Sequence, residues 1–227
     1  MSKLYLELSY IIKKSAPIYP NNPVERMEPI SRQDNGDVCN VSMIHHFTHN
    51  GTHLDTPFHH DPKGEKIETI PLEKFIYEHP VFLNIPKNYC EEITDNDLKG
   101  YDLQQADALL IRTGFDELRV QDPVGYSVMF PGVNLAAAKY IREELPALKT
   151  VIIDFMSIEK YLDGNRQGYP VHHQLLCMST SGKRPVLIIE DANLRPLVGK
   201  KLRKVFALPM RFEGADGVPV GLIAEVD

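Results

Sequence analysis

The most constraining feature of the sequence is an eleven-residue stretch in which four potential metal ligands or proton carriers are separated by even numbers of residues, namely His49, His53, Asp55 and His59. The spacings from His49 are four, six and ten residues, so an extended backbone would direct all four side chains to one face. A helix would separate them, because at about 100° per residue Asp55 would lie roughly 120° from His49. A glycine and a proline within the stretch also disfavour a helix. We therefore expect a strand or extended loop here.

Such a face has a chemical use, because imidazole nitrogens and carboxylate oxygens bind zinc, manganese or iron(II). Three protein ligands would leave positions open for water and substrate, as in catalytic metal sites. Gly51 would allow the backbone to approach closely. Chance clustering of histidines on a polar surface is the alternative, and it explains a pair better than it explains four. Asn50 occupies the place of the glutamate in the zincin pattern, and no cysteine pair has zinc-finger spacing.

The pattern His49-x-Gly-Thr-His-x-Asp-x-Pro-x-His59 resembles the signature of the metal-dependent cyclase-family hydrolases, a group that includes bacterial kynurenine formamidase and isatin hydrolase. The resemblance extends along most of the chain, in the segments Leu8-Ser9, Pro17-Ile-Tyr-Pro20, Ile70-Pro-Leu72, Leu110-Ile-Arg-Thr-Gly114, Val151-Ile-Ile-Asp154, Ala207-Leu-Pro-Met-Arg211 and Gly214-Ala-Asp-Gly-Val-Pro219. It implies an α/β fold with a central, barrel-like mixed β-sheet and outer helices. The residues themselves predict α/β and no more.

Composition bounds the class of protein. A chain of 227 residues, 43% of them hydrophobic, can bury a sizeable core, and without a linker we expect a single domain over residues 1–227. The net charge of -6 gives no electrostatic footprint for nucleic acid, so we expect a small-molecule substrate. No signal peptide or apolar run of membrane-spanning length is visible, which predicts a cytoplasmic protein. Three widely spaced cysteines, Cys39, Cys90 and Cys177, are expected to be free thiols.

The order of elements follows from short apolar runs and one amphipathic stretch. Asn134 is a plausible N-cap for a helix whose stripe of Leu135, Ala138, Ile141 and Leu145 ends before Pro146. Strands are expected at residues 3–8, 37–47, 81–85, 108–111, 151–153, 186–189, 202–208 and 219–226. A proline-rich loop after the first strand could cover a pocket, and Tyr19 within it is a candidate substrate contact or a simple aromatic staple.

Two later stretches could complete the site. His172-His173 follows a Gly-Tyr-Pro turn, and Glu190 ends a very apolar run, where an unpaired buried carboxylate would be costly. From this stretch alone, the favoured interpretation is a strand end at which Glu190 reaches solvent. The resemblance implies that a His-x-x-Leu-Leu segment and a later glutamate bind a second metal, and His172 matches this pattern better than His173. The interval between His172 and Glu190 is longer than the family pattern implies.

Two neighbours of the motif are further candidates. His45 lies an even number of residues from His49 and is a candidate to orient a ligand through a hydrogen bond; the alternative is an ordinary strand residue. Phe58 lies between the last two polar positions of the motif and is a candidate substrate contact.

Our leading hypothesis is a metal-dependent hydrolase of an amide C–N bond. Asp55 would bridge two divalent metals, zinc first and manganese or iron(II) as alternatives, with His49 and His53 on one and His172 and Glu190 on the other. A metal-activated water would attack, and His59 would act as general base and acid, a role that suits imidazole because its reference pKa in model peptides is about 6.5. The resemblance implies an aryl amide such as N-formylkynurenine as substrate, and the chain's lack of tryptophan leaves that choice open.

Alternative functions share the same residues. One is hydrolysis of an isatin-like imide or lactam, or of a lactone, and another is a metal-dependent cyclase or dehydratase. A metal-binding sensor or pseudoenzyme is the non-enzymatic alternative. It does not explain His59, because metal binding alone requires no proton carrier beside the ligands. The resemblance also implies a homo-oligomer, either a homodimer or a homotetramer.

Overall fold

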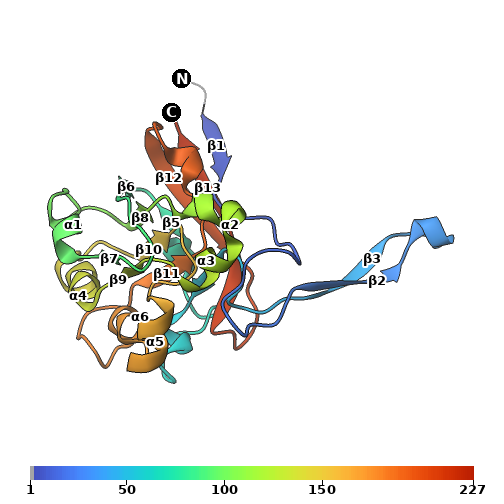
Figure 1. Ribbon diagram of the computed structural model, residues 1–227, viewed down its shortest axis with the longest axis horizontal. Coiled ribbons are helices and arrows are strands. Elements are labelled where there is room, and N and C mark those ends of the chain that lie inside the picture. The colour runs from blue at the N-terminus through green and yellow to red at the C-terminus, as the bar shows by residue number, and fades with distance from the viewer. Residues whose placement is uncertain (1–2) are drawn as a thin grey trace.

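The computed structural model describes residues 3–227, and its centre is a mixed β-sheet that bends nearly into a barrel (Figure 1). Within this range the nine-stranded sheet has the order β5-β12-β13-β4-β11-β10-β8-β6, with β1 pairing beside β13. Its strands are β1 (Leu4–Glu7), β4 (His53–Asp55), β5 (Ile76–Tyr77), β6 (Pro80–Asn84), β8 (Ala108–Arg112), β10 (Thr150–Ile153), β11 (Leu187–Glu190), β12 (Leu202–Pro209) and β13 (Gly217–Val226). Neighbours among β6, β8, β10 and β11 are parallel, whereas β4 pairs antiparallel with β11 and β13.

The near closure of the sheet follows from a short connection. β5 and β6 stand at opposite ends of the strand order, yet only Glu78 and His79 separate them in the chain. The sheet must therefore curve until its two ends meet. Asp107 stabilises the corner, since its carboxylate accepts hydrogen bonds from the backbone N–H groups of both residues, at 2.8 and 2.9 Å.

Alternating side chains of the central strands serve two separate cores. In β8, Leu109 and Ile111 pack against the helices outside the sheet, whereas Ala108 and Leu110 point into the barrel interior. All four are fully buried, as continuous apolar runs in parallel strands predict. The expected fold, a central mixed, barrel-like sheet with outer helices, is confirmed.

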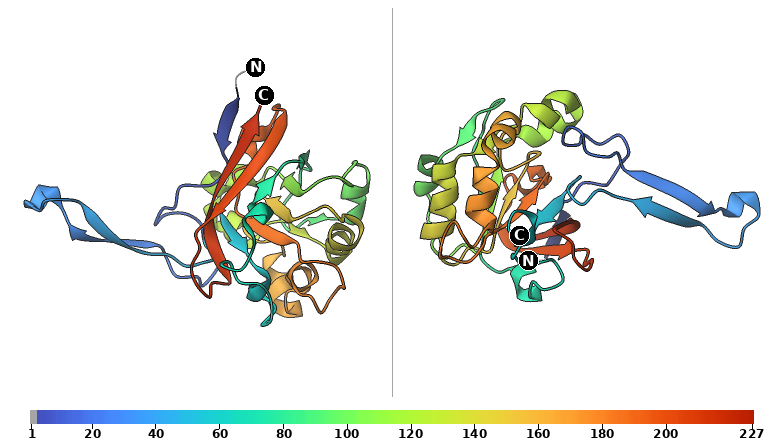
Figure 2. Two further views of the ribbon diagram at one scale, coloured as in Figure 1. Left: turned by 180° about the vertical axis from the view of Figure 1, so that it is seen from behind. Right: turned by 90° about the horizontal axis from the view of Figure 1, so that it is seen from below.

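The helices are short and cover one side of the sheet, where α4 and α6 lie together (Figure 2). The α-helices are α1 (Asp95–Lys99), α2 (Leu118–Gln121), α3 (Pro123–Val128), α4 (Leu135–Glu144), α5 (Tyr161–Gln167) and α6 (Pro170–Leu176). Single 3₁₀ turns occur at Gln33–Asn35, Pro57–His59, Leu72–Phe75, Phe115–Glu117 and Arg195–Leu197. None of the helices in residues 3–227 has the length and apolar character that a membrane span requires.

The predicted helix is present with its predicted cap. The Asn134 side chain accepts a hydrogen bond from the Ala137 N–H at 2.9 Å, and α4 ends just before Pro146. Ala138 and Ile141 are fully buried, but Leu135 at the first turn is 40% exposed, so the apolar stripe is shorter than predicted.

A long β-hairpin, here called the arm, projects from the body (Figures 1 and 2). It consists of β2 (Arg26–Ser31) and β3 (Val41–His45), which form a two-stranded sheet and pair with no other strand of residues 3–227. The predicted strand at residues 37–47 is therefore shorter and does not run into the motif. His45 lies on the arm beside Arg26 and Glu28, 3.1 and 3.3 Å away, so a role in orienting a ligand is wrong.

The remaining predicted strands are confirmed to within a few residues. At the N-terminus β1 pairs with β13, but Leu4 and Tyr5 are 46% and 55% exposed. The expected half-burial therefore begins at Leu6, which is partly buried, and is complete at Leu8. Two further strands, β7 (Glu92–Ile93) and β9 (Gly132–Val133), form a small separate ladder.

Candidate metal centre

The backbone of the eleven-residue motif is extended only in its middle. β4 covers His53–Asp55, His49 lies in a turn, and His59 ends a 3₁₀ turn that begins at Pro57. The prediction of one extended face is therefore wrong outside β4. Gly51 has φ +65°, and a Cβ there would meet nothing closer than 3.9 Å, so this glycine permits a left-handed turn and not a close approach. The turn brings the His49 imidazole back over β4.

Asp55 lies at the centre of the converging side chains. Its Oδ1 atom is 2.8 Å from His49 Nδ1 and 3.4 Å from His53 Nε2, and its Oδ2 atom is 3.8 Å from His172 Nε2. The side chain is 1% exposed, and Oδ2 has no hydrogen-bond partner within residues 3–227. A buried carboxylate oxygen without a donor is costly, and a cation would satisfy it.

The second half of the centre comes from α6 and the end of β11. Glu190 is 4% exposed and therefore does not reach solvent. Its two carboxylate oxygens lie 3.5 Å from His53 Nε2 and 3.4 Å from His172 Nε2. The neighbouring His173 turns away and faces Cys177 Sγ at 3.3 Å. The geometry thus favours His172 over His173, and the long interval after α6 leaves His172 and Glu190 facing each other.

Two acidic residues that sequence reasoning missed orient the histidines. Glu159 Oε2 lies 2.7 Å from His172 Nδ1, so it directs the Nε2 atom of this ring toward Asp55 and Glu190. Asp216 Oδ2 lies 2.9 Å from His49 Nε2 and 3.2 Å from His59 Nδ1. Asp216 falls within the Gly214–Pro219 segment that resembles the family, which was the available signal.

Ligand atoms converge in two groups that share Asp55. In one group the atoms come from His49, Asp55 and His59, and in the other from His53, Asp55 and Glu190. Within each group all of them lie within 4.8 Å of one another. Nitrogen and carboxylate donors at this spacing fit a divalent cation. Because the first group includes His59, this residue is close enough to bind a metal ion as well as to carry a proton.

The carboxylates make the centre strongly favourable for positive charge. Burial lowers the pKa of His49, but Asp55 and Asp216 outweigh it and raise that pKa to about 10. Burial likewise opposes the charged form of His172, and Glu159, Glu190 and Asp55 raise its pKa to about 10. Despite its burial, the pKa of the Asp55 carboxyl is held well below its ordinary value by His49 and His53. A bound metal ion would take the place of the protons that His49 and His172 carry in its absence.

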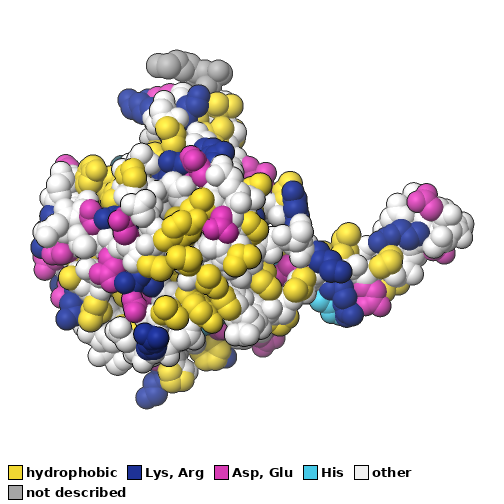
Figure 3. All heavy atoms as spheres, viewed as in Figure 1, with side chains coloured by type: hydrophobic (Ala, Val, Ile, Leu, Met, Phe, Trp, Pro, Cys, Tyr) yellow, Lys and Arg dark blue, Asp and Glu magenta, His cyan; other side chains and the backbone are white. Residues whose placement is uncertain are grey.

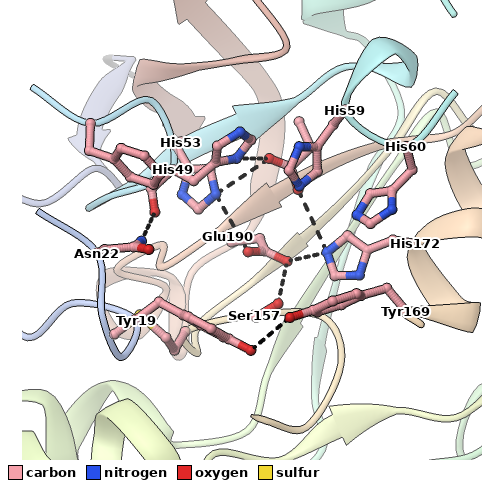
Figure 4. A pocket seen from close by; sticks show the side chains of 13 residues that line it. Tyr19, Asn22, His49, His53, His59, His60, Ser157, Tyr169, His172 and Glu190 are labelled. Atoms are coloured by element: carbon pink, nitrogen blue, oxygen red, sulfur yellow. Dashed lines mark hydrogen bonds and ion pairs between the residues drawn. The ribbon is translucent and has the colours of Figure 1, made fainter. Parts of the chain in front are cut away.

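The centre opens into a cavity of about 250 Å³, shown in Figure 4. Beyond the metal-ligand candidates, its lining consists of Tyr19, Asn22, Phe47, His60, Met156, Ser157 and Tyr169. Tyr19 therefore lies where a substrate contact was expected. Phe58 is not part of the lining, because its ring packs under the Lys66 ammonium group, 4.8 Å away.

Tyr19 and Tyr169 meet at the side of the cavity opposite the motif histidines (Figure 4). Their hydroxyl oxygens are 3.3 Å apart, and the Asn165 side-chain amide donates to the Tyr19 oxygen at 2.9 Å. Burial raises the pKa of the Tyr19 phenol, so this hydroxyl stays protonated. Tyr169 was not predicted, and its packing requires Gly164, where a Cβ would lie 2.8 Å from the ring.

Comparison with known proteins assigns the chain to a family. The model of the putative cyclase family matches residues 6–160. Kynurenine formamidase of Bacillus cereus is 28% identical over 189 residues, which are 83% of this chain and 81% of that protein. Two solved structures share the fold. A predicted metal-dependent hydrolase from Bacillus stearothermophilus has a TM-score of 0.77 at 24% identity, over 99% of both chains. Isatin hydrolase A from Ralstonia solanacearum has a TM-score of 0.82 at 20% identity, over 99% of this chain and 92% of that one. The resemblance predicted from the motif is thus confirmed, and the chain belongs to the putative cyclase family.

Proposed function

We propose that this chain is a metal-dependent hydrolase that cleaves the C–N bond of a small aryl amide, as an arylformamidase does. The observation that carries the proposal is the buried convergence of imidazoles and carboxylates on Asp55 at the floor of an aromatic-lined cavity. Among the described residues, no donor reaches the Oδ2 atom of Asp55. The similarity to a kynurenine formamidase and to isatin hydrolases supports this reaction class.

Five residues would hold the metal. His49, His53 and Asp55 would hold one ion, and Asp55, His172 and Glu190 a second, with Asp55 shared between the two. The two ligand sets adjoin at His53 and Glu190, whose Nε2 and Oε2 atoms are 3.5 Å apart. This donor set suits zinc best among common cellular metals, with manganese as the alternative. A bound divalent ion acts as a Lewis acid toward a carbonyl group and makes water a stronger acid, which supplies a nucleophile near neutral pH.

His59 is positioned to carry the proton. Because the Asp216 carboxylate can only accept a hydrogen bond, His59 Nδ1, 3.2 Å away, must donate, which leaves Nε2 as the basic nitrogen. The ring stacks on that of His49 with centroids 4.0 Å apart, so it lies beside the metal ligands. His59 would take a proton from the attacking water and return it to the leaving nitrogen.

The cavity walls fit a planar aromatic substrate of modest size. Tyr19, Phe47 and Tyr169 offer ring surfaces for stacking. The cavity volume of about 250 Å³ lies just below that of the smallest typical ligand sites, about 300 Å³, so the substrate should be small. A cyclic amide of the isatin type would meet the same walls, and the likeness to isatin hydrolase structures makes it the second candidate.

The test is hydrolysis of a substrate panel by the purified protein. N-formylkynurenine, isatin and an aryl lactone would be offered before chelation, after chelation, and after zinc or manganese is restored. We expect metal-dependent turnover of the formamide, with formate and the free amine as products. His59→Ala should lose this turnover, whereas the matched control His79→Ala, at an exposed site outside the cavity, should keep it. Metal uptake without turnover of any member would favour a sensor or pseudoenzyme.

We also propose that the arm packs against a second copy of this chain. Met27 and Ile44 face each other across its strands and are 67% and 68% exposed. Apolar side chains are visible between charged ones along the arm (Figure 3). An isolated two-stranded hairpin is marginally stable in water, so such a surface favours a partner. The arm begins and ends next to the cavity-lining residues Asn22 and Phe47, so a second copy there would border the site.

Sedimentation of the purified protein tests this proposal. The wild type should be a homodimer or homotetramer at micromolar concentration. Ile44→Asp should shift it toward the monomer, whereas Val120→Asp, at an apolar site on α2 that is 85% exposed, should not. A monomeric wild type would refute the proposal.

A further inference from the structure

The residue that follows Glu190 has an unusual backbone. Asp191 has φ +50°, in the left-handed region that residues other than glycine seldom adopt, and it is 1% exposed. Such a conformation persists only where the surrounding contacts hold it, and it is often found near functional sites. Its position directly after a candidate metal ligand raises the question of what holds it.

The Asp191 side chain is held by three donor contacts. Arg119 from α2 donates two hydrogen bonds to it, from Nε to Oδ1 and from Nη2 to Oδ2, both at 2.8 Å. The Tyr126 hydroxyl from α3 donates to Oδ1 at 2.5 Å. One face of the guanidinium group is covered by the Tyr10 ring, whose centroid is 3.9 Å from Arg119 Cζ. We call Arg119, Tyr126 and Asp191 the clamp.

The Asp191 backbone connects the clamp to both strands that carry metal-ligand candidates. Its carbonyl oxygen accepts a hydrogen bond from Thr52 Oγ1 at 2.6 Å, and Thr52 immediately precedes His53. Its N–H donates to the Phe155 carbonyl oxygen at 3.0 Å. In the sheet, Glu190 stands directly opposite His53. One residue thus fixes the end of β11 against the start of β4.

We propose that the clamp is a positioning element that sets the spacing of Glu190 and His53 for metal binding, an inference that rests on the metal centre of the proposed function. A contribution to stability does not explain the Arg119–Asp191 ion pair, because replacing a buried ion pair by apolar residues is often neutral or stabilising. Metal binding does explain it, since metal–ligand distances must be held to within about 0.2 Å of their preferred values. Loss of groups that support ligands typically costs about 10–100-fold in metal affinity.

The test measures Co²⁺ binding by the full-length protein, by competition with a chromophoric chelator and by the visible spectrum of the bound ion. The double variant Arg119→Met/Asp191→Asn removes both charges, so no buried charge is left unpaired, and asparagine tolerates the left-handed backbone. We expect it to bind Co²⁺ about 10–100-fold more weakly and to show a changed spectrum. Tyr126→Phe, which removes one hydroxyl, should produce a smaller change in the same direction.

The chain contains a matched control, the buried ion pair of Arg112 and Asp116. Its two hydrogen bonds, at 3.1 and 2.9 Å, resemble those of the clamp, but it makes no contact with a ligand candidate in the described part of the chain. Arg112→Met/Asp116→Asn should therefore leave Co²⁺ affinity and spectrum unchanged. A clamp variant that binds Co²⁺ with wild-type affinity and spectrum would overturn the clamp alone. A wild type that takes up no Co²⁺ would overturn the metal centre and the clamp together.

Discussion

Gly217→Ala should weaken metal binding by displacing His49. A Cβ at position 217, the first residue of β13, would lie 2.4 Å from Cε1 of the His49 ring and 2.9 Å from both of its nitrogens. Carbon atoms in favourable contact are about 3.5–4.0 Å apart, so the imidazole would have to move by about 1 Å. The displacement would break the contacts of His49 with Asp55 and Asp216, which are 2.8 and 2.9 Å long.

Such a movement is large compared with what a metal site tolerates. Metal–nitrogen distances vary by about 0.2 Å, so His49 would cease to act as a ligand, and affinity should fall by at least the roughly 10–100-fold typical of a lost supporting group. In the metal-free protein, each charge-assisted hydrogen bond contributes about 1.5–3 kcal/mol, so loss of both should lower the free energy of unfolding by about 3–6 kcal/mol. Alanine's smaller loss of backbone entropy on folding offsets a small part of this.

Zinc titration against a chromophoric chelator measures the affinity, and denaturant unfolding measures the stability. The control is Gly221→Ala in the same strand, where a Cβ would meet Leu208 Cβ at an ordinary 3.7 Å. It should bind zinc as the wild type does. If Gly217→Ala also bound zinc with wild-type affinity, His49 would not be a ligand held against β13.

Three further outcomes are expected. Asp55→Asn should reduce the content of both metals while His172→Ala mainly affects one, as elemental analysis would show; two equivalents retained by Asp55→Asn would exclude a bridge. His59→Ala should keep its metals yet lose roughly 10²–10⁴-fold in turnover, measured on the same sample, and a parallel fall in metal content would make His59 a ligand instead. Burial raises the pKa of Asp154 from 3.8 to about 6, so its contribution to stability is fully present below pH 3.8 and is lost as the pH rises through 6. Relative to Asp154→Asn, the metal-free wild type should lose about 3 kcal/mol over that range in urea unfolding, and a pH-independent difference would contradict the raised pKa.

The sequence was most informative where the signal is local. The α4 helix is predicted from its cap at Asn134 and from an apolar stripe with a helical period; the cap is present, and the stripe is present without its first residue, Leu135. Central strands such as β8 and β10 are continuous apolar runs, which burial on both faces requires. The ligand candidates of the motif could be proposed because their spacing is short and specific.

The sequence was least informative where distant segments meet. Asp216 lies just before β13, Glu159 in a loop after β10, and Tyr169 just before α6. No local pattern relates any of them to His49. The convergence of the motif itself had a different cause from the one expected. Tertiary contacts fold its two ends into a turn and a 3₁₀ helix, so even spacing on a single strand was an incomplete explanation.

The most direct test of the proposed centre is to count its metal and measure its hydrolytic rate on one sample. Elemental analysis and turnover of N-formylkynurenine would be followed through exhaustive chelation and stepwise return of zinc. The proposal predicts two metal equivalents per chain, loss of turnover on chelation, and recovery in proportion to the metal restored. Undiminished turnover by protein that carries less than about one-tenth of an equivalent would contradict it, because catalysis would then not depend on the ion that Asp55 and its neighbours are proposed to bind.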